Sequence, residues 1–423
     1  MKVTLVAYGT RGDVQPFVCL GAELAERGHR VRLLTPRNGA AMARGAGLDT
    51  VELPLDVQQM MTAPPAQRML AAGRISAFFR WLHREEQGYL DALREALIEG
   101  TRDAETIVCH PLVEDRCAAL AEARGVPLLA VHVFPILPTR RAPSAFIAQR
   151  DLGVLNRATH ALMLGMLWRF SRGEVARLRL ELGLPGARCS HSRAIARGQA
   201  PVLLAYSPLL APAPDDWAPG LRPTGALTPS PRMRQSFGEA GLPPELEDWL
   251  QAGAAPVFLG FGSMPVLEVE PFLLMIRRTL RKLGLRAVLG AGWSELGDAR
   301  DEQIFSLAGV DHQSLLPRCA GAVHHGGAGT VHASLAAGTP TLVCSVFADQ
   351  PYWGRRCRAL GVGETFPFKR LDERRLSAGL ERLLEPSTRA AAHDLARRMG
   401  EERPLAAAVA MVEQAAPQAL ATA

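Results

Sequence analysis

Short apolar runs alternate with longer stretches at helical spacing along the 423-residue chain. Residues 3–7 are a continuous apolar run. A glycine-containing turn follows at 8–13, helical spacing covers 14–27, and residues 31–34 are apolar again. Unbroken apolar runs between helical stretches are typical of strands buried on both faces of a parallel sheet. The chain is therefore predicted to open as strand, turn, helix and strand of a doubly wound α/β fold.

The same alternation restarts in the second half of the chain. Residues 208–231 are rich in Pro, Ala and Gly, which predicts a linker between the two halves. We predict two consecutive Rossmann-like domains at 1–215 and 216–403, followed by a C-terminal helix and tail at 404–423. Further strands are expected at 107–109, 128–131, 257–260, 286–289, 304–308, 320–323 and 341–346, and helices at 271–283, 331–337 and 404–414.

Two further helical stretches, 66–97 and 155–170, carry aromatic and aliphatic residues among arginines. Basic amphipathic helices can lie on anionic lipid. The same faces can instead line an acceptor pocket or pack in the core, which is the default interpretation for a soluble chain. We predict a cytoplasmic protein and keep peripheral membrane contact as an open alternative.

Composition narrows the class of partner. The chain is 48% hydrophobic and 21% charged, as in ordinary globular proteins. Its formal charge of +6 comes from scattered Lys and Arg without basic blocks, so nucleic acid is not an expected partner. The seven cysteines form no CxxC pair and no cluster at zinc spacing, which predicts reduced thiols and no zinc site.

No stretch reaches the ~18 apolar residues of a membrane span. The oligomeric state is not set by the sequence.

The stretch from His324 to Gln350 concentrates candidate chemistry. Two histidines end an apolar run, and the turn Gly326-Gly327-Ala328-Gly329-Thr330 opens a helix of small residues. Bare backbone N–H groups and the helix dipole make such a turn a seat for phosphate. The glycines alone fit a plain packing turn equally well. The pair Asp349-Gln350 follows the next strand, and both features therefore lie at carboxyl ends of strands, where α/β sheets bind ligands.

The segments HHGGAGT and FADQPYWG together resemble the donor-binding region of family 1 glycosyltransferases with the GT-B architecture. The most similar branch contains sterol glucosyltransferase-like and glycopeptide-antibiotic glycosyltransferases. The resemblance reaches both ends of the chain but is thin between residues 54 and 207. It implies two Rossmann-like domains facing each other across a cleft, with the nucleotide-sugar on the C-terminal half and the acceptor on the N-terminal half.

The resemblance also implies an activity. A UDP- or TDP-sugar is the co-substrate, no other cofactor is required, and a hexose passes with inversion to a hydroxyl of a lipophilic small molecule such as a sterol, polyketide or lipid. Transferases that hold the diphosphate through a metal use an Asp-x-Asp pair, which this chain lacks. The helix dipole, a histidine and hydroxyl groups are then expected to stabilise the negative charge of the leaving diphosphate.

Carried over residue by residue, the family motifs assign the donor site. His324 and Ser263 contact phosphate, and Asp349 with Gln350 binds sugar hydroxyls. Val310 and Gln313 match the nucleoside contacts. The chain departs from the pattern in having Val310 where plant members have a stacking Trp, and His332 where many members have a ribose-binding Glu. The predicted donor-binding residues are Gly12, Ser263, Val310, Gln313, His324, Gly326, Gly327, Ala328, Gly329, Thr330, Asp349 and Gln350.

Asp13 is the candidate general base. It stands in the turn after the first strand, and the resemblance places a catalytic carboxylate in this loop. An Asp before Val14 also suits the N-cap of the following helix, which is the structural alternative. The histidines at positions 29, 110, 132 and 160 are treated as core groups and receive no role.

Three other functions remain open at this point. A nucleotide-sugar epimerase shares the architecture but would need acid and base groups around the sugar. A dinucleotide oxidoreductase is disfavoured because neither glycine turn is a complete G-x-G-x-x-G and the second strand lacks the expected acid. A catalytically inactive nucleotide-sugar-binding protein is disfavoured by the intact Asp13 and Asp349-Gln350.

Overall fold

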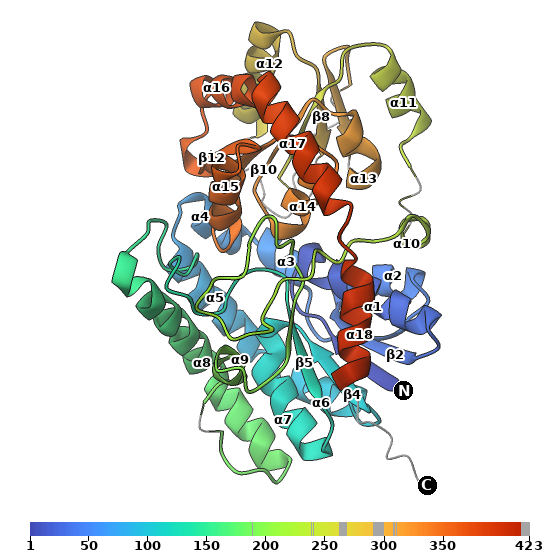
Figure 1. Cartoon of the computed structure of the whole chain (residues 1–423), viewed down its shortest axis with the longest axis vertical. Coiled ribbons are helices and arrows are strands. Elements are labelled where there is room, and N and C mark those ends of the chain that lie inside the picture. The colour runs from blue at the N-terminus through green and yellow to red at the C-terminus, as the bar shows by residue number, and fades with distance from the viewer. Residues whose placement is uncertain are drawn as a thin grey trace. The chain divides into compact units, whose positions relative to one another are not determined.

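The computed structural model describes residues 1–187, 189–237, 239, 241–261, 269–290, 300–307, 309 and 311–415. The chain forms two compact units (Figure 1). The first consists of Met1–Val57, Leu82–Gly238 and Arg403–Ala423, and the second of Gln58–Trp81 and Glu239–Glu402.

The first unit is built on a six-stranded parallel sheet in the order β3-β2-β1-β4-β5-β6. Its central strands are fully buried runs of Val, Leu, Ile and Ala, which is why they were recognisable as apolar runs in the sequence. Its strands are β1 (Lys2–Val6), β2 (Arg30–Pro36), β3 (Asp49–Leu53), β4 (Thr106–Cys109), β5 (Leu128–His132) and β6 (Val202–Leu204).

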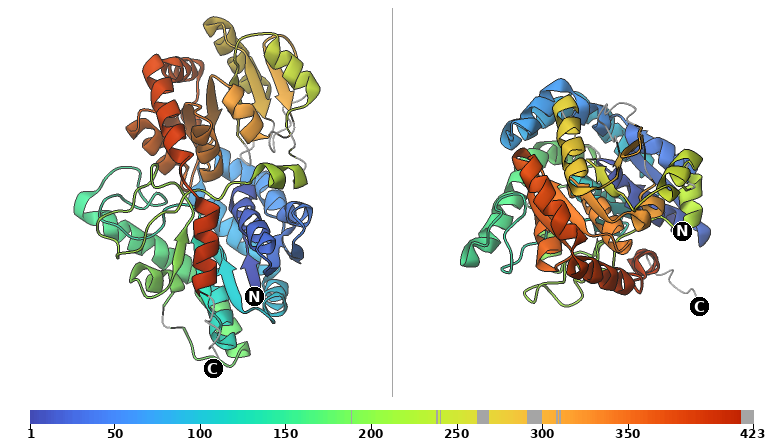
Figure 2. Two further views of the ribbon diagram at one scale, coloured as in Figure 1. Left: turned by 45° about the vertical axis from the view of Figure 1, so that its right-hand side comes forward. Right: turned by 90° about the horizontal axis from the view of Figure 1, so that it is seen from above.

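Helices cover both faces of this sheet. The last helix, α18, packs beside α1 although it lies at the far end of the chain (Figure 2). Ala408, Val409 and Val412 of α18 join the buried core that α1 forms with β1 and β2. The helices of the first unit are α1 (Arg11–Glu26), α2 (Arg37–Gly45), α6 (Leu90–Gly100), α7 (Glu114–Arg124), α8 (Asn156–Glu181), α9 (His191–Ala196), α10 (Pro231–Ser236) and α18 (Pro404–Ala415), with short 3₁₀ turns at Pro111–Val113 and Gly153–Leu155.

The second unit repeats the design with a six-stranded parallel sheet in the order β12-β11-β10-β7-β8-β9. Its strands are β7 (Val257–Gly260), β8 (Ala287–Gly290), β9 (Ile304–Leu307), β10 (Gly321–His324), β11 (Thr341–Ser345) and β12 (Gly363–Pro367). The predicted α/β fold with two Rossmann-like sheets is confirmed, because both sheets have the same doubly wound strand order.

The second unit also contains most of the remaining helices. They are α3 (Val57–Thr62), α4 (Pro64–Ala71), α11 (Pro244–Gln251), α12 (Val269–Leu283), α13 (His312–Leu315), α14 (Ala328–Ala336), α15 (Gln350–Ala359), α16 (Glu373–Leu384) and α17 (Pro386–Met399), with 3₁₀ turns at Leu316–Arg318 and Phe368–Arg370. One more helix, α5 (Ile75–Gln87), contributes residues to both units.

The segment 58–81 belongs to the second unit although its neighbours in sequence belong to the first. Its aromatic side chains pack on the loop after β11, where the ring of Phe347 lies 5.9 Å from Phe78 and 6.4 Å from Phe79. Phe78 is fully buried there. For this stretch of aromatic and basic residues, the core interpretation is the one that the structure supports.

The strand order places a topological switch point in each unit. In the first sheet β1 and β4 are neighbours whose connections leave in opposite directions, and in the second sheet β7 and β10 have the same relation. Ligands of doubly wound proteins bind outside the carboxyl ends of such strands. Asp13 follows β1, and the histidine–glycine turn follows β10.

Candidate functional site

The predicted phosphate turn lies between β10 and α14. Gly327 is the N-cap of α14, and the first intrahelical hydrogen bond runs from the N–H of Val331 to the carbonyl of Gly327. The N–H groups of Ala328, Gly329 and Thr330 precede that bond and are orphan donors of the helix terminus. Gly329 is exposed, and a Cβ atom placed on it would meet no atom within 4 Å. The turn therefore leaves space for an anion at its donors.

Gly326 has the opposite role, because it makes a close internal contact. Its φ of +90° lies in the left-handed region. A Cβ atom here would lie 2.3 Å from Cγ1 of Val343 and 3.3 Å from the carbonyl oxygen of Gln350. Only glycine allows this approach. The contact brings the phosphate turn against β11 and against the Asp349-Gln350 pair, so the two motifs form one site.

His324 is fully buried at the end of β10. Its Nδ1 accepts the N–H of Gly326 at 3.1 Å, so Nε2 carries the proton of the neutral ring and faces Oγ1 of Thr341 at 3.2 Å. Burial, with the nearby His325 and His312, lowers the pKa of His324 well below its ordinary value. In this arrangement His324 shapes the turn as a neutral ring. A phosphate contact by His324 would have to replace one of these bonds.

His325 differs from its neighbour in having an unused ring nitrogen. The side chain is 8% exposed, and its buried Nδ1 has no hydrogen-bond partner in the described part of the chain. The ring lies against Gly327, where a Cβ atom would be 2.7 Å from Nε2 of His325. Burial lowers the pKa of His325 to about 4, so the ring is neutral at pH 7. Buried polar atoms normally have partners, and an orphaned nitrogen beside an open phosphate turn fits a bound ligand.

The Asp349-Gln350 pair is held by the loop after β11. Oε1 of Gln350 accepts the N–H groups of Val346 and Phe347 at 2.8 and 3.2 Å, which closes the loop. Asp349 occupies the N-cap position of α15 but makes no side-chain capping bond, and its Oδ2 instead accepts Nε1–H of Trp353 at 2.7 Å. The Asp349 carboxylate thus holds the Trp353 ring of the same helix and makes no capping bond to the backbone.

The same loop holds a strained residue. Ala348 has a φ of +57° and is the only non-glycine residue with positive φ among those described. A left-handed residue with a Cβ atom costs about 1–2 kcal/mol. Such strain persists where surrounding contacts hold it and is frequent at ligand sites. Here it immediately precedes the pair predicted to bind the sugar.

The remaining residues predicted for phosphate and nucleoside are only partly described. Ser263 and Val310 lie outside the described residues. Gln313 is half-buried in α13, and its N–H donates to Oδ1 of Asp311 at 3.0 Å. His332, which stands at the family's ribose position, is buried. Its Nδ1 donates to the carbonyl of Ala328 at 2.7 Å. The His332 side chain therefore stabilises the first turn of α14 from inside.

Asp13 lies in the first turn of α1, and the interpretation of Asp13 as the N-cap is wrong. The helix begins at Arg11, Thr10 is the N-cap, and Asp13 is the third helical residue. Its Oδ2 accepts the N–H of Thr10 at 2.8 Å and the Thr10 hydroxyl at 3.1 Å. This is the return bond of a capping box. The exposed Gly12 directly precedes Asp13 in the first turn.

Gly9 lets the Asp13 carboxylate take this position. Its φ is +134°, and a Cβ atom on Gly9 would lie 2.3 Å from Oδ2 of Asp13. The side-chain amide of Asn38, in the first turn of α2, donates to the carbonyl of Gly9 at 3.3 Å and fixes the loop. The Asp13 side chain is 23% exposed, so the carboxylate can be reached by a substrate while it is held on one side.

His110 is a site residue that the sequence reasoning did not select. It follows β4, the neighbour of β1, and its Nε2 lies 3.3 Å from Oδ1 of Asp13, within ion-pair distance but without hydrogen-bond alignment. Nδ1 accepts the N–H of Leu112, so Nε2 carries the proton of the neutral ring. The signal was its position directly after an apolar strand. It became meaningful only once β1 and β4 were known to be neighbours.

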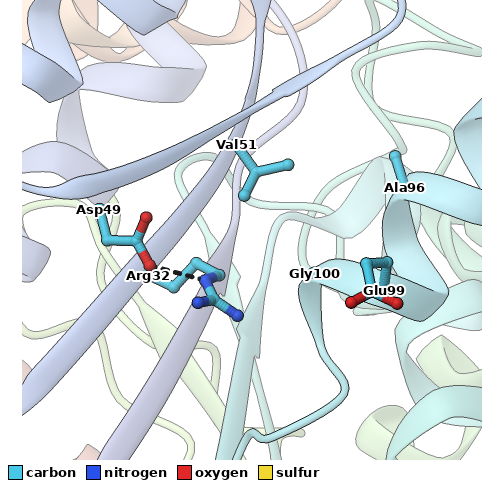
Figure 3. Close-up of a pocket in the computed structure, with 6 residues that line it drawn as sticks. All are labelled: Arg32, Asp49, Val51, Ala96, Glu99 and Gly100. Atoms are coloured by element: carbon cyan, nitrogen blue, oxygen red, sulfur yellow. Dashed lines mark hydrogen bonds and ion pairs between the residues drawn. The ribbon is translucent and has the colours of Figure 1, made fainter.

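Figure 3 shows a hollow elsewhere in the first unit, between β2, β3 and α6. The Arg32 side chain there is already paired, with Nε 2.7 Å from Oδ2 of Asp49 and Nη1 3.0 Å from Oδ1 of Asp103. Asp49 begins β3, so the hollow lies away from the carboxyl ends of the strands. A guanidinium satisfied by two carboxylates offers no anion site. The lining residues are Arg32, Asp49, Val51, Ala96, Glu99 and Gly100.

Two family models and several known proteins match this chain. Residues 3–99 match the family described as glycosyltransferase family 28 N-terminal domain, and residues 302–414 match erythromycin biosynthesis protein CIII-like, C-terminal domain. An uncharacterized glycosyltransferase of Mycobacterium leprae (strain TN) is 31% identical over 415 residues, which cover 95% of this chain and 93% of that protein. A sterol 3-beta-glucosyltransferase of Arabidopsis thaliana is 30% identical over 97% of this chain and 64% of its own length.

Solved structures share the fold at low identity. The glycosyltransferase of kitacinnamycin matches with a TM-score of 0.69 and 18% identity, over 98% of this chain and 99% of that one. The glycosyltransferase VinC, solved in complex with DTDP, matches with a TM-score of 0.65 and 19% identity over the same shares. The two family models, the relative from Mycobacterium leprae and the shared fold all indicate a glycosyltransferase. The chain is a glycosyltransferase and belongs to family 1 of the GT-B fold.

Proposed function

We propose that the protein transfers a hexose from a UDP- or TDP-sugar to a hydroxyl of a lipophilic small molecule, with inversion at the anomeric carbon. The observation that carries the proposal is the close contact of Gly326 with Val343 and Gln350, which joins the phosphate turn to the sugar-binding pair. A diphosphate and the hexose attached to it need these two groups of donors and acceptors side by side. The relatives named as sterol 3-beta-glucosyltransferases support a lipophilic acceptor.

In this proposal the turn binds the diphosphate through the N–H groups of residues 328–330 and the positive end of α14. Nδ1 of His325, which has no partner among the described residues, accepts a hydrogen bond from a ligand or, in the other tautomer, donates one. Asp349 accepts hydrogen bonds from sugar hydroxyls, and the Gln350 amide nitrogen donates to them. The diphosphate gains negative charge as it leaves, and donors already in place stabilise that charge without reorganisation.

Asp13 is the proposed general base. The acceptor oxygen forms its bond to the anomeric carbon as the bond from that carbon to the phosphate oxygen breaks, and the hydroxyl proton passes to the Asp13 carboxylate. A positioned base typically contributes 10²–10⁴-fold. His110 is the proposed positioning residue, because its Nε2–H faces Oδ1 while Thr10 holds Oδ2.

The test is donor-dependent release of UDP or TDP in the presence of a panel of sterol, polyketide and lipid acceptors. Product mass identifies the transferred sugar, and proton NMR coupling constants give the anomeric configuration. Calorimetric titration with UDP and TDP is run in parallel. Failure to bind either nucleotide would refute the donor site itself, whatever the acceptor.

Three outcomes would replace the proposal with one of its rivals or correct the mechanism. Conversion of the sugar into its epimer without an acceptor would identify an epimerase. Nucleotide binding without transfer to any acceptor in the panel would favour an inactive binding protein. Retention of the anomeric configuration would refute single displacement with Asp13 as the base.

A further inference from the structure

The two arginine-flanked segments that suggested membrane contact have different surroundings in the fold. In the first, Phe78 is buried against Phe347. The second forms α8 and the turn before it, and much of its apolar surface is exposed. α8 runs along the outside of the first unit (Figure 1). Monomeric proteins rarely leave a contiguous apolar surface exposed without a use for it.

Four exposed apolar residues of α8 and of the turn before it lie along one side of the helix. Leu155, Leu162, Met166 and Phe170 are separated by seven, four and four positions, a spacing that brings them to one face. Their exposed fractions lie between 42% and 59%. Val154, just before them, is 94% exposed. Val175 and Leu178 on the other side of α8 are buried, and so are Thr159 and Met163 at the border of this face. α8 thus has buried and exposed apolar side chains, and Phe170 of the exposed set also contacts His83, with ring centroids 5.2 Å apart.

The segment that contains this face has an excess of exposed arginines. The exposed charged residues of 150–181 are five arginines and two acids, and none of the five arginines has an ion-pair partner within the described ranges. Both acids are already engaged. Asp151 accepts from the N–H of Gly153 and the amide of Asn156, and Glu181 pairs with Arg94. The five arginines are Arg150, Arg157, Arg169, Arg172 and Arg177.

We propose that this face of α8 binds the surface of a membrane that contains anionic lipid. Apolar side chains at the level of the headgroups, together with arginines that attract anionic headgroups, are the two elements of interfacial binding. None of the described helices is long and apolar enough to span a bilayer, so the contact would be peripheral. A second copy of this chain is the poorer occupant, because pairing two such faces would bring arginines against arginines.

The experiment is flotation of the full chain with vesicles of phosphatidylcholine alone and with vesicles that contain 30% phosphatidylglycerol. We expect the chain to float with the anionic vesicles and to remain unbound with the neutral ones. Raising the salt to 0.5 M should weaken the binding, because the arginine contribution is screened. Flotation does not depend on transferase activity, so its result is independent of the proposed function.

Two variants locate the binding face, and each changes only exposed residues. Leu162→Gln/Met166→Gln should lower the partition coefficient by about tenfold or more, because two apolar side chains no longer enter the interface. Arg169→Gln/Arg172→Gln should lower it by about fivefold for each arginine, roughly 25-fold in all. The matched control is Leu274→Gln/Arg278→Gln, which makes the same kinds of change at exposed positions of α12 and should bind as the native chain does.

Several results would overturn the proposal. They are absence of flotation with anionic vesicles at low salt, equal flotation with neutral vesicles, and a control variant that loses as much binding as the α8 variants. Light scattering that showed a dimer of the native chain and a monomer of Leu162→Gln/Met166→Gln would assign the face to a second copy. Melting temperatures of all variants within about 2 °C of the native value would establish that each is folded, since a 1 kcal/mol loss shifts domains of this size by about 2–4 °C.

Discussion

Replacement of Asp13 by Asn removes the proposed base and leaves a side chain of nearly the same shape. In the structure Oδ2 of Asp13 accepts two hydrogen bonds from Thr10, and Oδ1 faces Nε2 of His110 at 3.3 Å. The asparagine oxygen can keep the Thr10 bonds. Its NH₂ group then faces the His110 N–H, and His110 cannot change tautomer without losing the bond from Leu112. Asp13→Asn should therefore have a measurable cost in stability.

The two expected effects differ in size. The Thr10 bonds lose their charge assistance and one donor faces another donor, which together cost about 1–2 kcal/mol of unfolding free energy. That is a fall of roughly 2–8 °C in melting temperature, and it leaves nearly all molecules folded because native stability is ~5–15 kcal/mol. Loss of a general base lowers turnover by about 10²–10⁴-fold, or ~3–5 kcal/mol in the activation barrier. Instability therefore cannot account for a loss of turnover of that size.

The assay compares turnover, UDP or TDP affinity and melting temperature of Asp13→Asn with those of Thr10→Val. The Thr10 variant loses the hydroxyl bond to Oδ2 but retains the backbone bond and the carboxylate. We expect it to lose about 1 kcal/mol of stability while its turnover stays within about tenfold of native. Nucleotide affinity should be native in both variants, because the phosphate turn lies in the other unit.

One result would refute the reasoning about Asp13. If Asp13→Asn turned over at a near-native rate, the carboxylate would be only the return bond of a capping box. His110 would then be the next candidate for the base, and His110→Gln would be measured in the same assay. If both variants lost turnover equally, positioning of the loop and not proton transfer would explain the effect.

Three further predictions concern the second unit. His325→Ala should weaken UDP or TDP binding by about 1–3 kcal/mol, and it should lower the melting temperature less than His324→Ala does. His324→Ala should lower both the nucleotide affinity and the melting temperature, because this variant also loses the bond to Gly326. A larger fall in melting temperature for His325→Ala than for His324→Ala would contradict the assignment of the two rings. Gly326→Ala should destabilise the protein by more than about 2 kcal/mol, as its Cβ atom would overlap Val343, and native melting of this variant would contradict the close contact. Burial lowers the folded-state pKa of His325 and of His332 to about 4, against an ordinary 6.5, so only the unfolded chain takes up these protons between those values. The contribution of these two neutral histidines to the free energy of unfolding should be fully present above pH 6.5. It should fall towards pH 4 by up to about 1.4 kcal/mol per pH unit for each histidine. Equal melting temperatures at pH 7.5 and 5.5 would contradict this prediction.

Much of the fold and of the donor motif could be predicted from the sequence, because both depend on local patterns. Central strands of a parallel sheet are buried on both faces, so each appears as a continuous apolar run. The strands that were missed are β3, β6 and β12, which lie at sheet edges. β3 and β12 are only partly buried and contain polar residues, while β6 has three residues. The site motifs were visible because the turn and the Asp-Gln pair directly follow strands.

Only the tertiary structure decided how the site residues are used. The order of β1 and β4 in the sheet brings His110 to Asp13, and no spacing in the sequence encodes that neighbourhood. Hydrogen bonds distinguish the adjacent histidines, since His324 is saturated inside the turn and His325 keeps an unpaired nitrogen. Packing likewise separates two similar arginine-flanked segments into one buried against Phe347 and one exposed on α8. A side chain's partners depend on which elements the fold brings together, and that is set by burial of the whole chain, not by local pattern.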